Sequence, residues 1–384
     1  MDAEAGKGRD LIAHAHAEAA DPAAFDRLAR ALGPGPFALV VLFLSPEAVA
    51  GDLPARIAAA FGDTPVTGCT TAGEIGPGGY SEGGIVAIGL PAADFAAETL
   101  LVADLQAIDA QALIGDLIRA RHRLTAAHPG WDHEFAFLMV DGLSAKEDAL
   151  TAALAPGLGN APLFGGSAAD GTRFLETWVF HRGTALRNGA VLALVRTRCP
   201  VKVFKFDHFR PTETRMVVTG ADPSRRVVRT INAEPAAQEY ARLLGKDPGQ
   251  LTPFTFAAHP VVVRLGGRHH VRSIRQVDDN GDLIFYSAID EGLVLTLAEP
   301  LDMVAHLTAE FDALGSDAKP AAILACDCVL RRMEAQEKQL SPRISALMRQ
   351  HGVTGFSTYG EQLNAMHVNQ TLTGVAIYPP EDRA

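Results

Sequence analysis

The sequence predicts a mixed α/β fold of repeated strand–helix–turn–strand units, with mixed or antiparallel sheets covered by helices. Residues 66–75 and 353–362 share six of ten residues, including both glycines and the glutamate. Each segment follows an apolar strand and a helix, and each precedes a short apolar run. Hairpin signals between the two copies are frequent, which argues against a purely parallel doubly wound sheet.

Three segments of the chain have the same predicted order of strand, helix, glycine segment and strand. The first copy has a strand at 37–44, a helix at 54–61, the glycine segment and a strand at 85–88. The last copy has the same order at 321–325, 341–350, 353–362 and 374–377. A weaker middle copy follows the same order at 135–140, 144–154, 162–167 and 190–195. We therefore expect residues 37–91 and 321–380 to be equivalent units that arose by duplication.

Three segments describe the domain organisation. Residues 1–35 are predicted to be an N-terminal helical segment, because Asp21-Pro22 resembles a helix start and Gly33 a helix end. Residues 36–232 and 233–384 are predicted to be two domains. In the first domain we also expect a helix at 109–123 and strands at 173–181, 201–206, 214–219 and 226–231. In the second domain we expect strands at 261–265 and 293–298 and helices at 235–244, 301–314 and 331–339. Asn280-Gly281 predicts a hairpin between 270–277 and 282–287.

Composition excludes several classes of protein. The chain has 384 residues and a net charge of −11, with scattered Lys and Arg, so a nucleic-acid partner is not expected. No apolar run approaches the length of a membrane span, and the first ten residues lack a signal-peptide core. Four cysteines in such a chain do not form a disulfide framework. We expect a cytoplasmic, reduced protein without a membrane partner.

Several side chains are candidates for chemistry. His367 lies among amide side chains that could orient its ring, and the alternative is a half-buried histidine within a strand. Cys199 before a proline could be a thiolate ligand, although a cysteine at a strand start is favoured. Of His269 and His270, one could be buried, although a solvated pair is favoured. Glu74 and Glu361 recur in the repeat, which favours a structural role as acceptors of backbone N–H bonds.

The motifs resemble those of a known family. Residues 68–75, with the sequence GCTTAGEI, and 164–168, with FGGSA, are similar to the N-terminal half of the FIST sensory domain. Residues 326–332, with CDCVLRR, and 355–361, with GFSTYGE, are similar to its C-terminal half. The resemblance covers about residues 36–380 and implies a bacterial sensory input module that binds a small ligand.

The tail around residues 361–371 resembles the NosP-type subset of this family, which binds haem and senses nitric oxide. The resemblance implies a haem b cofactor and a partner enzyme, either a sensor histidine kinase or a cyclic-di-GMP enzyme, and it is compatible with a homo-oligomer. His367 is the expected iron ligand, and nitric oxide would weaken its bond to the ferrous iron. The expected cofactor-binding residues are His367, Arg331, Tyr359, Met366 and Asn369.

Two alternatives remain open. The first is a sensory protein for a small, amino-acid-like metabolite, with Arg331 binding the carboxylate and Arg332 on a solvated helix face. The second is a thiol hydrolase that uses Cys69 as its nucleophile. The equivalent of Cys69 in the last repeat is Phe356, and no common catalytic motif is present. We therefore expect no enzymatic activity, and we expect Cys69, Cys326 and Cys328 to be buried and reduced.

Overall fold

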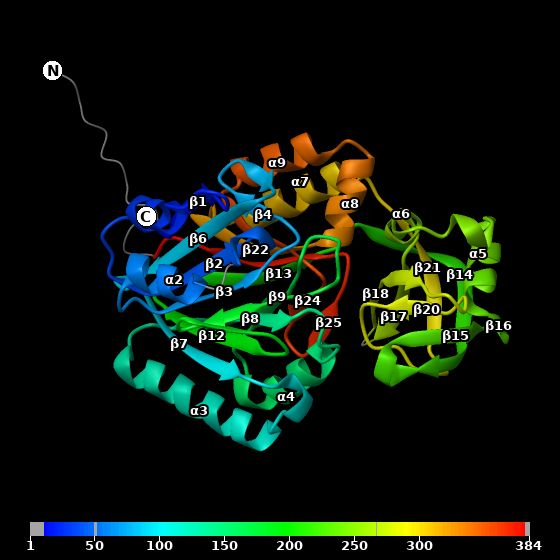
Figure 1. The fold of residues 1–384 in the computed structure, drawn as a ribbon, viewed down its shortest axis with the longest axis horizontal. Coiled ribbons are helices and arrows are strands. Elements are labelled where there is room, and N and C mark those ends of the chain that lie inside the picture. Colours follow the sequence, from blue (N-terminus) through cyan, green and yellow to red (C-terminus); the bar gives the residue numbers. More distant parts are fainter. Residues whose placement is uncertain (1–10, 50–51, 266, 381–384) are drawn as a thin grey trace.

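The computed structural model describes residues 11–49, 52–265 and 267–380, so the first ten residues of the predicted N-terminal segment lie outside it. The chain forms two lobes (Figure 1). The small lobe holds the segment from Phe209 to Pro300, and the large lobe holds the described residues on either side of it. The predicted boundary at 232/233 therefore falls inside the small lobe, and the large lobe draws on both predicted domains.

Three units of the same topology build the large lobe. The first contains β2 (Phe37–Leu44), α2 (Leu53–Phe61), β3 (Val66–Thr70) and β6 (Gly84–Pro91). The second contains β8 (His133–Asp141), α4 (Glu147–Leu158), β9 (Leu163–Ala168) and β12 (Ala190–Thr197). The third contains β22 (Ala322–Cys328), α8 (Val329–Glu337), α9 (Ser341–Gln350), β23 (Val353–Thr358) and β26 (Leu372–Ile377).

In every unit the first strand runs parallel to the second and antiparallel to the last. Gly68, Gly165 and Gly355 occupy the same place in the second strand, opposite Leu42, Leu138 and Ala325. The predicted equivalence of the first and last copies is confirmed, and the middle copy belongs to the same series. The mixed α/β fold class is also confirmed.

The units are joined by an exchange of hairpins that closes them into a ring. The hairpin of the first unit, β4 (Glu74–Gly76) and β5 (Gly79–Ser81), pairs with β23 of the third. The hairpin of the third, β24 (Glu361–Leu363) and β25 (Met366–Val368), pairs with β9 of the second. The hairpin of the second, β10 (Val179–His181) and β11 (Thr184–Leu186), pairs with β3 of the first.

Each six-stranded sheet gains one outer strand beside the last strand of its unit. These strands are β1 (Ala13–Glu18), β7 (Phe95–Val102) and β13 (Val201–Phe206). β1 corrects the prediction that the N-terminal segment is helical throughout. In the sequence AHAHAE, Ala15 and Ala17 are buried while His14 and His16 are exposed, and this period of two is that of a strand. The predicted helix is present as α1 (Ala24–Leu32).

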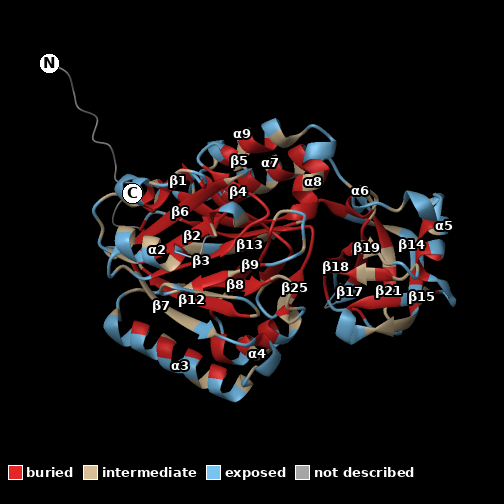
Figure 2. Ribbon diagram, viewed as in Figure 1, coloured by how far each residue is buried: buried red, intermediate tan, exposed pale blue. Residues whose placement is uncertain are grey.

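The main core lies where the three sheets meet. Phe43 stacks on Phe356, and Phe137 stacks on Phe164, with ring centroids 4.4 and 4.8 Å apart. Helices cover the outer faces, as Figure 2 shows from their buried inner stripes. These are α1 and α2 on the first unit, α3 (Ala110–Ala127) and α4 on the second, and α7 (Met303–Leu314) and α9 on the third.

The small lobe has its own core and a mainly antiparallel sheet. Its elements are β14 (Phe209–Asp222), β15 (Val227–Ile231), β16 (Glu234–Pro235), α5 (Ala236–Leu244), α6 (Pro253–Ala258), β17 (Val261–Leu265), β18 (Arg268–Arg272), β19 (Ile274–Val277), β20 (Leu283–Phe285) and β21 (Val294–Pro300). β19 and β20 form the hairpin predicted from Asn280-Gly281. None of the helices in residues 11–49, 52–265 and 267–380 is long and apolar enough to cross a membrane.

Candidate functional site

The carboxyl ends of the parallel strands enclose a pocket of about 280 Å³, which we call the ring pocket. Crevices outside the carboxyl ends of parallel strands are common ligand sites in α/β folds. The lining residues come from the loops after β2, β3 and β9, from the start of β4, from the turn between β5 and β6, and from one face of α8. They are Ser45–Glu47, Thr71–Glu74, Glu82, Gly83, Asp170–Arg173, Val329, Arg332, Met333 and Gln336.

Arg332 is the buried cation of the ring pocket, and its side chain is only 5% exposed. One guanidinium nitrogen, Nη2, donates to the carbonyl oxygen of Ser81 at 2.8 Å and pairs with Glu82 at 3.1 Å. Its Nε is buried and has no hydrogen-bond partner. The prediction that Arg332 lies on a solvated helix face is wrong, because this face of α8 packs against the first unit. Gly73 is needed there, since a Cβ would lie 2.3 Å from Arg332 Nη1.

Arg331 points away from the ring pocket into a buried polar network. Its Nε pairs with Asp327 at 2.8 Å, and its Nη1 contacts His208 Nδ1 at 2.8 Å. The other ring nitrogen of His208 lies 2.9 Å from Glu334. Arg331 thus already has a carboxylate partner, and a ligand carboxylate would have to displace Asp327.

Glu74 and Glu361 make the same contacts in the first and third units. Thr71 Oγ1 donates to Glu74 at 2.6 Å, and Thr358 Oγ1 donates to Glu361. Each carboxyl group also accepts a backbone N–H at the start of the last strand of its unit, from Gly84 or Thr371, at 3.2 Å in both units. The expected structural role of the two glutamates is confirmed.

Burial raises the pKa of Glu74 to about 7 and that of Glu361 to about 8, because the charged carboxylate is poorly solvated there. An unfolded glutamate titrates near 4.5. A carboxyl group whose pKa is raised on folding stabilises the fold fully below the unfolded pKa. This stabilisation is lost as the pH rises through the folded value.

We expect Glu361→Gln to remove most of this pH dependence at position 361. Glutamine keeps the shape of the protonated carboxyl group, and its amide N–H can face Thr358. Since one pKa unit corresponds to about 1.4 kcal/mol, the unfolding free energy of the wild type should fall by roughly 3–5 kcal/mol more than that of the variant between about pH 4 and pH 9. Urea unfolding of both proteins across this range is the measurement. Parallel curves would contradict the raised pKa of Glu361.

A short loop after β9 joins the ring pocket to the small lobe. The Asp170 carboxylate accepts the backbone N–H groups of Phe174, Leu175 and Glu176 at 2.9–3.0 Å, and Tyr359 Oη donates to it as well. Phe174 stacks on Tyr359 with ring centroids 4.4 Å apart, and the small lobe's Tyr286 lies 6.0 Å from Phe174. Tyr359, predicted to bind a cofactor, therefore organises this loop.

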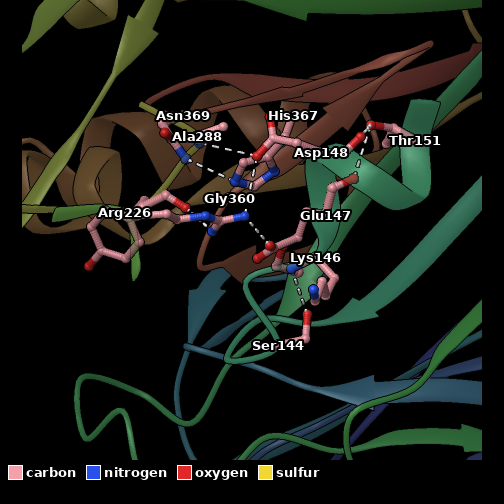
Figure 3. Close-up of polar contacts among 12 residues, drawn as sticks. Ser144, Lys146, Glu147, Asp148, Thr151, Arg226, Ala288, Gly360, His367 and Asn369 are labelled. Carbon is pink, nitrogen blue, oxygen red and sulfur yellow. Dashed lines mark hydrogen bonds and ion pairs between the residues drawn. The ribbon is translucent and has the colours of Figure 1, made fainter. Parts of the chain in front are cut away.

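His367 lies on β25 beside the small lobe and is 1% exposed. Its Nδ1 is 3.2 Å from Gln362 Nε2, and its Nε2 is 3.5 Å from Asn369 Nδ2. Figure 3 shows the Asn369 side chain facing the ring. A Cβ at Gly360 would lie 2.4 Å from His367 Cε1, so the ring packs directly on that backbone. Burial lowers the pKa of His367, which favours the neutral imidazole.

Polar contacts beside His367 hold the lobes together. Arg226 of the small lobe donates to Glu147 at 2.6 Å and to Asp148 at 3.2 Å (Figure 3). Arg272 donates to the carbonyl oxygen of His367 at 3.2 Å. His367 therefore lies within the contact between the lobes, where its position depends on their arrangement.

The residues around His367 do not fit a haem in this arrangement. Both ring nitrogens face amide side chains, and His367 lines neither the ring pocket nor the four other main pockets of the described residues. Within the described ranges, no group of three or more His, Cys, Asp or Glu side chains could hold a metal ion. Of the predicted cofactor-binding residues, Asn369 contacts His367, and Tyr359 lies just before the hairpin that carries it. Arg331 lies elsewhere, beside Asp327. Met366 is half-buried beside His367 in β25.

The cysteines lie in the core. Cys69, Cys326 and Cys328 are buried free thiols, and burial raises the pKa of each well above its usual value. A nucleophilic cysteine needs the opposite shift and access to a substrate. Cys199 is also fully buried. Of the histidine pair, His270 is buried and His269 is exposed.

Sequence reasoning missed Asp170, Phe174 and Arg275, which form the contact between the ring pocket and the small lobe. Asp170-Gly171 carries a turn signal that could have marked the loop. Arg275 carries none, because its contact crosses between segments about a hundred residues apart.

Comparison with protein families gives two adjoining matches. The FIST N domain matches residues 38–234, and the FIST C domain matches residues 236–364. The junction lies beside the predicted boundary at 232/233. No curated protein matches the chain.

Proposed function

The chain belongs to the FIST family of signalling sensor domains, and from this premise we propose that it binds a small zwitterionic metabolite, such as an amino acid, in the ring pocket. The observation that carries this proposal is the buried Arg332 guanidinium, whose Nε lacks a partner at the wall of that pocket. An unsatisfied N–H of a buried cation is costly, and a ligand carboxylate would satisfy it.

The other charges of the ring pocket suit a zwitterion. Arg173 supplies a second cation, and Glu47 supplies a carboxylate for an ammonium group, whereas Glu82 already pairs with Arg332. Glu47 is exposed and has no hydrogen bond or ion pair with another described residue. A volume of about 280 Å³ is near the lower limit of typical ligand pockets, about 300 Å³, which favours a ligand of amino-acid size.

The loop after β9 would carry the signal. Residues 170–173 line the ring pocket, while Phe174 contacts the small lobe. A ligand that prefers one position of this loop shifts the population of lobe arrangements, and a partner enzyme can respond to that shift. The proposed partner is a sensor histidine kinase or a cyclic-di-GMP enzyme.

Haem-based sensing of nitric oxide would require a rearrangement around His367. The Nε2 atom of His367 would have to leave Asn369, and the two lobes would have to separate beside β25. We therefore treat haem as the outcome that would replace the metabolite proposal. A Soret band after haem reconstitution, lost in His367→Ala but kept in His269→Ala and His270→Ala, would establish it.

The test of the metabolite proposal is a thermal-shift panel with each of the standard amino acids. At least one should raise the Tm of the wild type. Glu47→Gln removes an exposed charge and should raise the Kd for that amino acid by about tenfold or more, as expected for the loss of a charge-assisted hydrogen bond. Arg332→Met should abolish the response, while Arg343→Met, at an exposed position of α9, should leave it unchanged. A panel without a response, or one unchanged in both ring-pocket variants, would overturn the proposal.

A further inference from the structure

The two lobes enclose a second cavity of about 70 Å³, which we call the inter-lobe cavity. Phe174 and Tyr359 form its wall on the large lobe, where their rings stack. Tyr286 and Arg275 form its wall on the small lobe. The cavity lies on the far side of the 170–176 loop from the ring pocket, because residues 170–173 line one space and Phe174 lines the other.

Arg275 is an arginine of the lobe contact whose charge no carboxylate of the described residues neutralises. Its guanidinium lies over the Phe174 ring, with Cζ 4.9 Å from the centroid. Its Nε is buried and lacks a hydrogen-bond partner. No carboxylate of the described residues forms an ion pair with it. A contact with an aromatic ring satisfies none of the five N–H donors of a guanidinium as a hydrogen bond to an oxygen would.

The neighbouring Arg226 shows the contrast. It also lines the inter-lobe cavity, but Glu147 and Asp148 neutralise it, and the carbonyl oxygen of Tyr286 accepts a third bond. Arg225 adds another positive charge at the wall. Among the lining residues no Asp or Glu is present. The cavity is therefore a partly enclosed space with excess positive charge and aromatic walls.

We propose that the inter-lobe cavity binds a small carboxylate anion, held by Arg275 between the rings of Phe174 and Tyr286. A planar carboxylate matches the paired N–H groups of a guanidinium, which gives a bidentate contact. The volume restricts the ligand to a short aliphatic acid. This site is separate from the ring pocket and does not depend on the function proposed for that pocket.

Occupation of this site would also tie the lobes together. Arg275 belongs to β19 of the small lobe, and Phe174 belongs to the large lobe. An anion that neutralises Arg275 removes the cost of enclosing an unpaired charge between them. The closed arrangement of the lobes should therefore bind the anion better than an open one.

Acetate is the probe for this proposal, with acetamide as an uncharged molecule of the same shape. At equal ionic strength, sodium acetate should raise the Tm above that in sodium chloride, whereas acetamide should not. Arg275→Met should weaken the acetate Kd by about tenfold or more, the loss expected for a charge-assisted contact. Arg268→Met, at the exposed start of β18, is the matched control and should bind acetate normally.

Arg332→Met separates the two sites, since it should lose the amino-acid response and keep the acetate response. The proposal is overturned if acetate and acetamide shift the Tm equally. It is also overturned if Arg275→Met binds acetate as the wild type does, or if chloride gives the same stabilisation.

Discussion

Gly355→Ala is expected to prevent stable folding, or to lower the unfolding free energy by more than about 4 kcal/mol. A Cβ at this position would lie 1.8 Å from the carbonyl oxygen of Ala325 on the neighbouring strand. The carbonyl oxygen and the Cα that would carry the new Cβ both belong to the backbone of paired strands inside a sheet, so neither can move without breaking the ladder between β22 and β23. Soluble yield and urea unfolding are the measurements.

The equivalent glycines should behave in the same way. A Cβ would lie 2.1 Å from the Leu42 oxygen at Gly68 and 2.3 Å from the Leu138 oxygen at Gly165. Gly78→Ala is the control, because nothing lies within 4 Å of a Cβ there and its φ is not positive. If Gly355→Ala and Gly78→Ala had the same unfolding free energy, this would contradict the close approach of the first two strands in the three units.

Asp170→Ala is expected to cost on the order of 3–5 kcal/mol and to release the loop that joins the ring pocket to the small lobe. The substitution leaves the three backbone N–H groups of residues 174–176 and the Tyr359 hydroxyl without their acceptor. Proteolysis between residues 170 and 176 should accelerate, and the amino-acid response should be lost. Urea unfolding and limited proteolysis measure the two effects.

Asp109→Ala is the reference for an ordinary helix cap. Asp109 accepts one backbone N–H at the exposed N-terminus of α3, and its loss should cost about 1 kcal/mol of unfolding free energy. Tyr359→Phe removes the hydroxyl that donates to Asp170 and accepts the backbone N–H groups of Asp170 and Phe174 at 3.3 Å. The loss of unfolding free energy should lie between those of the two aspartate variants. An Asp170→Ala protein as stable and as protease-resistant as Asp109→Ala would contradict the role given to this loop.

The sequence predicts the repeated units well because their signals are local. Apolar runs, the glycine segments and helix boundaries follow from neighbouring residues, as for β2, β17 and α9. The recurrence of Glu74 and Glu361 in two repeats likewise predicts a structural role, since a catalytic group is rarely needed at the same place in two copies of a unit. The alternation of Ala and His in β1 was the local signal that the helical interpretation of residues 13–18 overlooked.

The closed ring could not be predicted, because its hairpins pair with strands of other units. Glu361 lies beside Gly166, almost two hundred residues away in the chain. The role of Arg332 depends on the same long-range packing. The pair of Arg331 with Asp327 is a local contact four residues apart, but the pocket beside Arg332 exists only because the first unit packs against this face of α8. The burial of His367 could not be predicted either, because it depends on contact with the small lobe.

Hydrogen exchange of the 170–176 loop, with and without the amino acid that raises the Tm most, tests the central claim most directly. If a ligand in the ring pocket reports to the small lobe, exchange should slow in residues 170–176 and in residues 272–287 beside them. Arg332→Met should show neither change. Binding that leaves exchange in both segments unchanged, while protecting another part of the chain, would contradict the account.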